Sequence, residues 1–211
     1  MRWISWLIGA SLAAAQPVTG GTAYDQLSLL YAHPAVLSLS TVPVCSGHGC
    51  AVVKPVRISD QQWEQVTGEL TPPAADAVGE RRQIGRAIAL MERITGVLAG
   101  TAGDRGGNLA GMVTSEPQMD CIDESSNTTT YLSLLEKHGL LRWHSVEPPA
   151  HRGYLIFGGW PHFTAVIRDQ GTDRRWVVDS WFHDNGQSPE IVDLETWKSG
   201  WVPQHVNASA D

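Results

Sequence analysis

The chain has 211 residues, with 15 Lys and Arg against 22 Asp and Glu, and a formal net charge of −7. A hydrophobic fraction of 42% supplies enough apolar side chains for a buried core, which excludes an intrinsically disordered chain. The acidic balance excludes nucleic-acid binding through a basic surface, and no apolar run is long enough for a multi-pass membrane protein.

Residues 1–15 have the pattern of a secretory signal peptide. Arg2 precedes an apolar stretch that ends in small side chains, with Ala13 and Ala15 at the expected cleavage site. We therefore expect a secreted or periplasmic protein that is not embedded in a membrane after the signal is removed. The remainder, residues 16–211, is predicted to form a single domain.

An N-terminal extension over residues 16–70 is predicted to contain β-strands, because two apolar segments flank Cys45 and Cys50. The four-residue spacer between these cysteines is flexible enough for a disulfide, and an oxidising compartment permits one. A metal site of Cys45, His48 and Cys50 is the alternative, although no fourth ligand at zinc-like spacing is evident.

Helices are expected on either side of Thr71. Ser59 and Gln62 form a capping-box pattern that predicts a short helix to about Glu69. Apolar residues at intervals of three and four predict a long helix over residues 74–98. The Gly-rich segment 99–118 is predicted to be a long loop, a kind of segment that often carries function in compact domains.

Another helix is expected to begin near Cys121, with Asp120 as its N-cap, and to end at His138 before Gly139. The rest of the chain is predicted to be strands followed by a last short helix. The expected strands are residues 140–146, 154–157, 162–168 and 174–181, and the helix is 194–197.

Cys121 is the odd cysteine, and an unpaired thiol in an exported protein needs a reason. The first turn of a helix favours the thiolate, which is the nucleophilic form of cysteine. The carboxylates of Asp123 and Glu124 oppose this unless they point to solvent. An inert, buried cysteine is the alternative.

His162 and Asp179 lie on the two arms of a predicted hairpin whose turn is centred between Gln170 and Gly171. That centre sets the two residues directly opposite each other, with side chains on one face and Cβ atoms about 4.5–5.5 Å apart. The same register brings Arg168 close to Asp173 near the turn. A slip of one residue would place Asp179 on the wrong face.

Cys121, His162 and Asp179 together fit a nucleophile, a base and a residue that orients the base. Gln118 is a candidate side-chain donor to an oxyanion. Trp160 and Trp181 are candidates for the walls of a substrate cleft. His183 is a rival base beyond the strand, whereas His144 is expected on the strand surface and His138 at a helix end. No metal or organic cofactor is expected.

The segments PQMDCIDESSN, WPHFTAVI and WVVDSW resemble the transglutaminase-like branch of the papain-like cysteine hydrolases, which includes bacterial transglutaminase-like cysteine peptidases. The resemblance covers about residues 84–182. It implies an α+β, papain/transglutaminase-like fold with the nucleophile helix packed on an antiparallel sheet, and a catalytic core over residues 71–211. It also implies a catalytic triad of Cys121, His162 and Asp179 in that chain order.

Three functions remain open at this point. The first is a cysteine peptidase, amidase or acyltransferase that acts on peptide, amide or isopeptide bonds of a peptide or protein substrate. The second is a catalytically inactive binding module for a peptide or glycan. The third is a redox or metal-binding role for the cysteines.

Overall fold

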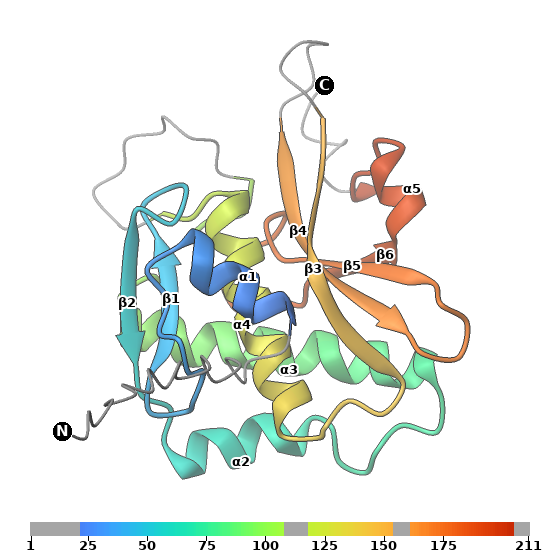
Figure 1. Ribbon diagram of the computed structural model, residues 1–211, viewed down its shortest axis with the longest axis horizontal. Coiled ribbons are helices and arrows are strands. Elements are labelled where there is room, and N and C mark those ends of the chain that lie inside the picture. The colour runs from blue at the N-terminus through green and yellow to red at the C-terminus, as the bar shows by residue number, and fades with distance from the viewer. Residues whose placement is uncertain (1–21, 108–117, 154–160, 205–211) are drawn as a thin grey trace, which may run out of the picture.

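The computed structural model describes residues 22–107, 118–153 and 161–204. Within these ranges the chain forms helices and two antiparallel sheets, which confirms the predicted α+β class (Figure 1). The helices are α1 (Thr22–Leu30), α2 (Asp60–Gly68), α3 (Ala77–Ala99), α4 (Cys121–Lys137) and α5 (Leu194–Lys198). The strands are β1 (Val42–Ser46), β2 (Val52–Val56), β3 (His144–Arg152), β4 (His162–Asp169), β5 (Arg175–Asp179) and β6 (Glu190–Asp193).

Some predictions lie outside the described residues. They are the signal peptide at 1–15, the strand at 154–157, and most of the second half of the 99–118 loop. None of the described helices is both long enough and apolar enough to cross a membrane.

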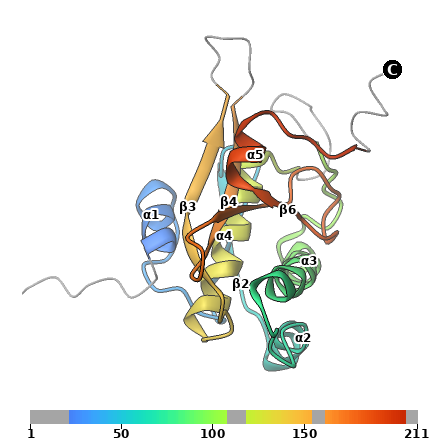
Figure 2. The same cartoon turned by 90° about the vertical axis from the view of Figure 1, so that its right-hand side faces the viewer.

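Helix α4 is the central element of the fold. It lies between the β1–β2 hairpin and the four-stranded sheet (Figure 1), with α1 on one side of the molecule and α2 and α3 on the other (Figure 2). Its buried surface includes small polar residues such as Thr128, Thr129 and Thr130, and small side chains let neighbouring backbones approach closely. Helix α4 therefore packs against both sheets, through β1 of one and β3, β4 and β5 of the other.

Local capping explains where α4 starts and stops. The Asp120 carboxylate accepts hydrogen bonds from the N–H groups of Ile122 and Asp123, and the Asp123 carboxylate accepts one from the N–H of Asp120. Gly139 follows the helix with a φ of 68°, a conformation that glycine adopts without strain. Both predicted ends of the helix are confirmed.

Helix α3 presents its predicted apolar stripe to the core. Ile84, Ile88 and Met91 are fully buried, and Thr95 shares a hydrogen bond of 2.7 Å with the Tyr131 hydroxyl of α4. The capping box of Ser59 and Gln62 at the start of α2 is also confirmed.

The four-stranded sheet has the order β3-β4-β5-β6. The predicted β4–β5 register is wrong by two residues, because Ala165 lies opposite Val178 and the same register sets Asp179 opposite Thr164, not His162. The Asp169 carboxylate explains the difference. It accepts hydrogen bonds from the N–H groups of Gly171 and Thr172, which stabilises a longer turn than the one predicted.

A shift of two residues preserves the alternation of side chains, so His162 and Asp179 still share a face. The ion pair expected between Arg168 and Asp173 is present, with nitrogen and oxygen 3.0 Å apart. The sequence did not predict β6, and β3 runs further along the chain than residues 140–146.

Candidate active site

Cys121 occupies the first residue of α4 and is the free cysteine of the described chain. Its side chain is buried, and its sulfur contacts the carbonyl oxygen of Pro161 at 3.8 Å. The backbone N–H of Phe163 also acts on the sulfur, in the direction that favours the thiolate. The sulfur of Cys121 thus lies against the backbone on both sides of His162.

The surroundings of Cys121 nevertheless favour the protonated thiol. Burial raises the pKa of the Cys121 thiol to about 11, and the negative charges of Asp120 and Asp179 add to the effect. The expected preference for thiolate at a helix start is therefore outweighed by loss of solvent. Asp123 and Glu124 do not point to solvent either, since both are buried.

His162 and Asp179 form a buried pair at the start of β4 and the end of β5. The Nε2 atom of His162 lies 2.8 Å from Oδ2 of Asp179. Because an ionised carboxylate only accepts hydrogen bonds, Nε2 carries the hydrogen and Nδ1 is the basic nitrogen of the neutral ring. Among the described residues the structure shows no hydrogen bond between His162 and Cys121.

Trp197 of α5 is a third member of this arrangement that sequence reasoning missed. Its indole Nε1 donates to Oδ2 of Asp179 at 2.8 Å, and its ring centre lies 5.4 Å from that of His162. The Arg152 guanidinium carbon lies over the Trp197 ring, 4.3 Å from the ring centre, and the guanidinium donates to the Trp197 carbonyl. Trp197 therefore fixes the carboxylate that holds the imidazole.

Aromatic side chains surround the His162 ring. Trp181, a predicted cleft residue, lies 4.7 Å away between ring centres and is half-buried, and Phe182 lies 5.4 Å away. Trp160, the other predicted cleft residue, lies outside the described residues.

Gln118 lies beside the start of α4, but its side chain is held by the neighbouring loop. Its Oε1 accepts from the N–H of Arg105 at 3.1 Å, and its Nε2 donates to the carbonyl of Gly103 at 3.2 Å. These bonds direct the amide toward that loop. The rival base His183 pairs with Glu190 of β6 at 3.0 Å.

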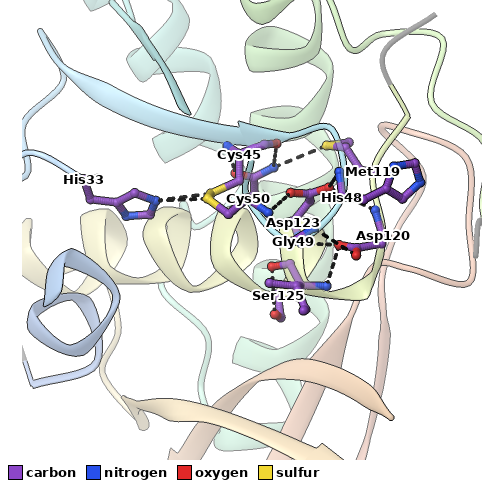
Figure 3. Close-up of a disulfide and its surroundings, with 11 residues drawn as sticks. His33, Cys45, His48, Gly49, Cys50, Met119, Asp120, Asp123 and Ser125 are labelled. Atoms are coloured by element: carbon purple, nitrogen blue, oxygen red, sulfur yellow. Dashed lines mark hydrogen bonds between the residues drawn. A yellow bond between two sulfur atoms is a disulfide. The ribbon is translucent and has the colours of Figure 1, made fainter. Parts of the chain in front are cut away.

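The predicted disulfide between Cys45 and Cys50 is present, and its loop packs against the start of α4 (Figure 3). The N–H groups of His48 and Cys50 donate to the two carboxylate oxygens of Asp123 at 2.8 and 2.7 Å. Burial and the nearby charge of Asp120 raise the pKa of Asp123 to about 6. The loop thereby supports the residues that flank Cys121.

The imidazole beside the two sulfurs is that of His33, not of His48 as the predicted metal alternative had it. His33 Nε2 lies 3.2 Å from Sγ of Cys45 and 3.8 Å from Sγ of Cys50. Burial lowers the pKa of His33 to about 4, so its ring is neutral at neutral pH.

Two buried glutamates, Glu92 of α3 and Glu124 of α4, lie between these helices, an arrangement that the sequence did not predict. Glu92 and Glu124 are both buried, and one carboxylate oxygen of each has no hydrogen-bond partner among the described residues. Burial raises the pKa of Glu92 to about 7 and that of Glu124 well above its usual range. The neighbouring Asp104 adds to both effects.

No family model, curated protein or solved structure matches this chain.

Proposed function

We propose that the protein is an exported thiol-dependent hydrolase of papain/transglutaminase-like type that cleaves peptide, amide or isopeptide bonds of a peptide or protein. Cys121 is the nucleophile, His162 the general base, and Asp179 the residue that orients the base. The observation that carries the proposal is the buried His162–Asp179 pair of 2.8 Å, which joins β4 to β5 directly after Pro161, whose carbonyl contacts the Cys121 sulfur.

The tautomer of His162 supplies the first step. Asp179 keeps the hydrogen on Nε2, so Nδ1 accepts the proton of the Cys121 thiol as the sulfur attacks the substrate carbonyl carbon. A carbon–sulfur bond forms, and the carbonyl electrons move onto oxygen. When the tetrahedral intermediate collapses, the imidazolium gives its proton to the leaving amine, and a thioester remains on Cys121.

Water completes the cycle. His162 takes a proton from water as the oxygen attacks the thioester. The carbon–sulfur bond then breaks to release a carboxylic acid, and the imidazolium returns the proton to the sulfur, which restores the thiol and the neutral ring. Burial raises the pKa of Cys121 to about 11, which favours the protonated thiol at rest. The scheme needs no resting pair of thiolate and imidazolium. The base acts as the sulfur attacks.

The raised pKa of Cys121 also favours a second candidate, a catalytically inactive module that binds a peptide or glycan beside Trp181. A protonated thiol that makes no hydrogen bond to His162 in the described structure is consistent with such a role.

A substrate profile separates the two candidates. Peptide, amide and isopeptide libraries are incubated with the wild type, Cys121→Ser, His162→Ala and the matched control His183→Ala. If the protein is a hydrolase, only the wild type and His183→Ala should cleave a library member. Mass spectrometry should then detect a thioester on Cys121 that hydroxylamine releases. Binding of a library member by Cys121→Ser, with no cleavage by the wild type, would instead support the binding module.

A further inference from the structure

The side chains of His33, Cys45 and Cys50 form a compact set of metal-ligating atoms outside the candidate active site. The three ligand atoms all lie within 4.8 Å of one another, and the side chains are 8%, 0% and 7% exposed (Figure 3). His33 comes from the segment after α1, whereas Cys45 lies near the end of β1 and Cys50 precedes β2. Folding therefore brings the imidazole to sulfurs that lie 12 and 17 residues further along the chain.

The chemistry of these donors is that of a thiophilic metal. Thiolate and imidazole ligands suit Zn²⁺, with bonds of about 2.3 Å to sulfur and about 2.0–2.1 Å to nitrogen. Tetrahedral ligands at such distances are separated by about 3.5–3.8 Å. The two separations between the His33 nitrogen and the sulfurs, 3.2 and 3.8 Å, are already close to this range.

The backbone around the cysteines is held by bonds that do not involve the sulfurs. The Asn127 side chain accepts from the N–H of Cys45 at 2.7 Å and donates to its carbonyl at 3.0 Å. The Asp123 carboxylate accepts a hydrogen bond from the N–H of Cys50. Opening the disulfide therefore leaves the two cysteines beside each other and beside His33.

Charge favours a divalent ion in this buried place. Two thiolates carry two negative charges and the neutral imidazole carries none, so Zn²⁺ makes the site electrically neutral. A monovalent ion would leave a net negative charge in the interior.

We propose that, when a dithiol reduces the Cys45–Cys50 bond, His33 and the two cysteines become a Zn²⁺-binding site. The dithiol gives two electrons and two protons to the disulfide and becomes a disulfide itself. Zn²⁺ then displaces the two thiol protons and binds both sulfurs and His33 Nε2, with its fourth position taken by water or another small ligand. The site is independent of the proposed hydrolase.

The test uses the full chain with Cys121→Ser, so that these two cysteines supply every thiol. The protein is reduced, freed of reductant without oxygen, and titrated with Zn²⁺ against a chromophoric chelator. We expect one Zn²⁺ per reduced chain and none per oxidised chain. His33→Ala is expected to weaken binding by at least about tenfold, while the matched control His48→Ala stays within about twofold.

X-ray absorption at the zinc edge of the reduced Cys121→Ser chain, with His33 intact, provides a readout that does not depend on the folding of the His33 variant. Two sulfur neighbours and at least one nitrogen neighbour are expected. The proposal fails if the reduced chain binds no stoichiometric Zn²⁺, if His33→Ala binds as tightly as its parent, or if the absorption shows no sulfur neighbours.

Discussion

The buried Glu92 carboxyl makes a sharp prediction about stability and pH. Its side chain is 4% exposed, and burial together with the charge of Asp104 raises its pKa to about 7, while Arg93 acts in the opposite direction. A carboxyl whose pKa is raised on folding binds more protons in the folded state, so its contribution is favourable at low pH. Stability is then lost as the pH rises from about 4.5 to about 7.

The size of the effect follows from the two pKa values. The interval between 4.5 in the unfolded chain and about 7 in the folded chain corresponds to about 3 kcal/mol. Glu92→Gln keeps an oxygen that can accept the N–H of Gly186, now 3.0 Å from the carboxylate, and removes the charge. The free energy of unfolding of Glu92→Gln, relative to that of the wild type, should therefore be higher at pH 8 than at pH 5 by up to about 3 kcal/mol.

Urea unfolding at pH 5, 6, 7 and 8 measures this difference, with Glu64→Gln on the exposed surface of α2 as the control. The difference between variant and wild type is the useful quantity, because His33 acts with the opposite sign. Burial lowers the pKa of His33, so its contribution improves as the pH rises through the same range. A Glu92→Gln effect that does not change with pH would refute the reasoning.

Three further substitutions test other contacts. Trp197→Phe removes the 2.8 Å bond to Asp179 and should cost about 2 kcal/mol in urea unfolding and slow alkylation of the free thiol; an unchanged alkylation rate would limit the indole to a structural role. Asn127→Ala leaves the N–H and carbonyl of Cys45 without their partner, and a loss of about 3 kcal/mol is expected at pH 7; a change below about 0.5 kcal/mol would contradict it. His144 and backbone N–H groups lower the pKa of Glu80, whose contribution is present at neutral pH and lost in acid, so the destabilisation by Glu80→Gln should shrink between pH 6 and 3.5. A Glu80→Gln effect equal at both pH values would contradict that assignment.

Elements fixed by neighbouring residues could be predicted from the sequence. The ends of α4 follow from Asp120 and Gly139, and the start of α2 follows from Ser59 and Gln62. In each case the deciding hydrogen bonds or backbone angles involve residues within a few positions.

The β4–β5 hairpin shows where such reasoning stops. Its register depends on which N–H groups of the turn donate hydrogen bonds to the Asp169 side chain. Several types of turn are compatible with the same sequence. The shared face of His162 and Asp179 was nevertheless predictable, because it depends only on the two-residue period of a strand.

Contacts between distant elements could not be predicted. His144 is buried against Glu80 of α3, 2.8 Å from its carboxylate, and is not on the strand surface as expected. The approach of Trp197 to Asp179 and of His33 to the disulfide likewise depends on how the elements pack. No local pattern of residue types specifies that packing.

The central claim is that His162 controls the reactivity of the Cys121 sulfur, and it is tested without knowledge of the substrate. Native, unreduced protein has Cys45 and Cys50 in a disulfide, so iodoacetamide reports on Cys121 alone. At pH 7, the wild type and His183→Ala should be alkylated at least about tenfold faster than His162→Ala. Equal rates in all three proteins, or labelling only after denaturation, would contradict the account.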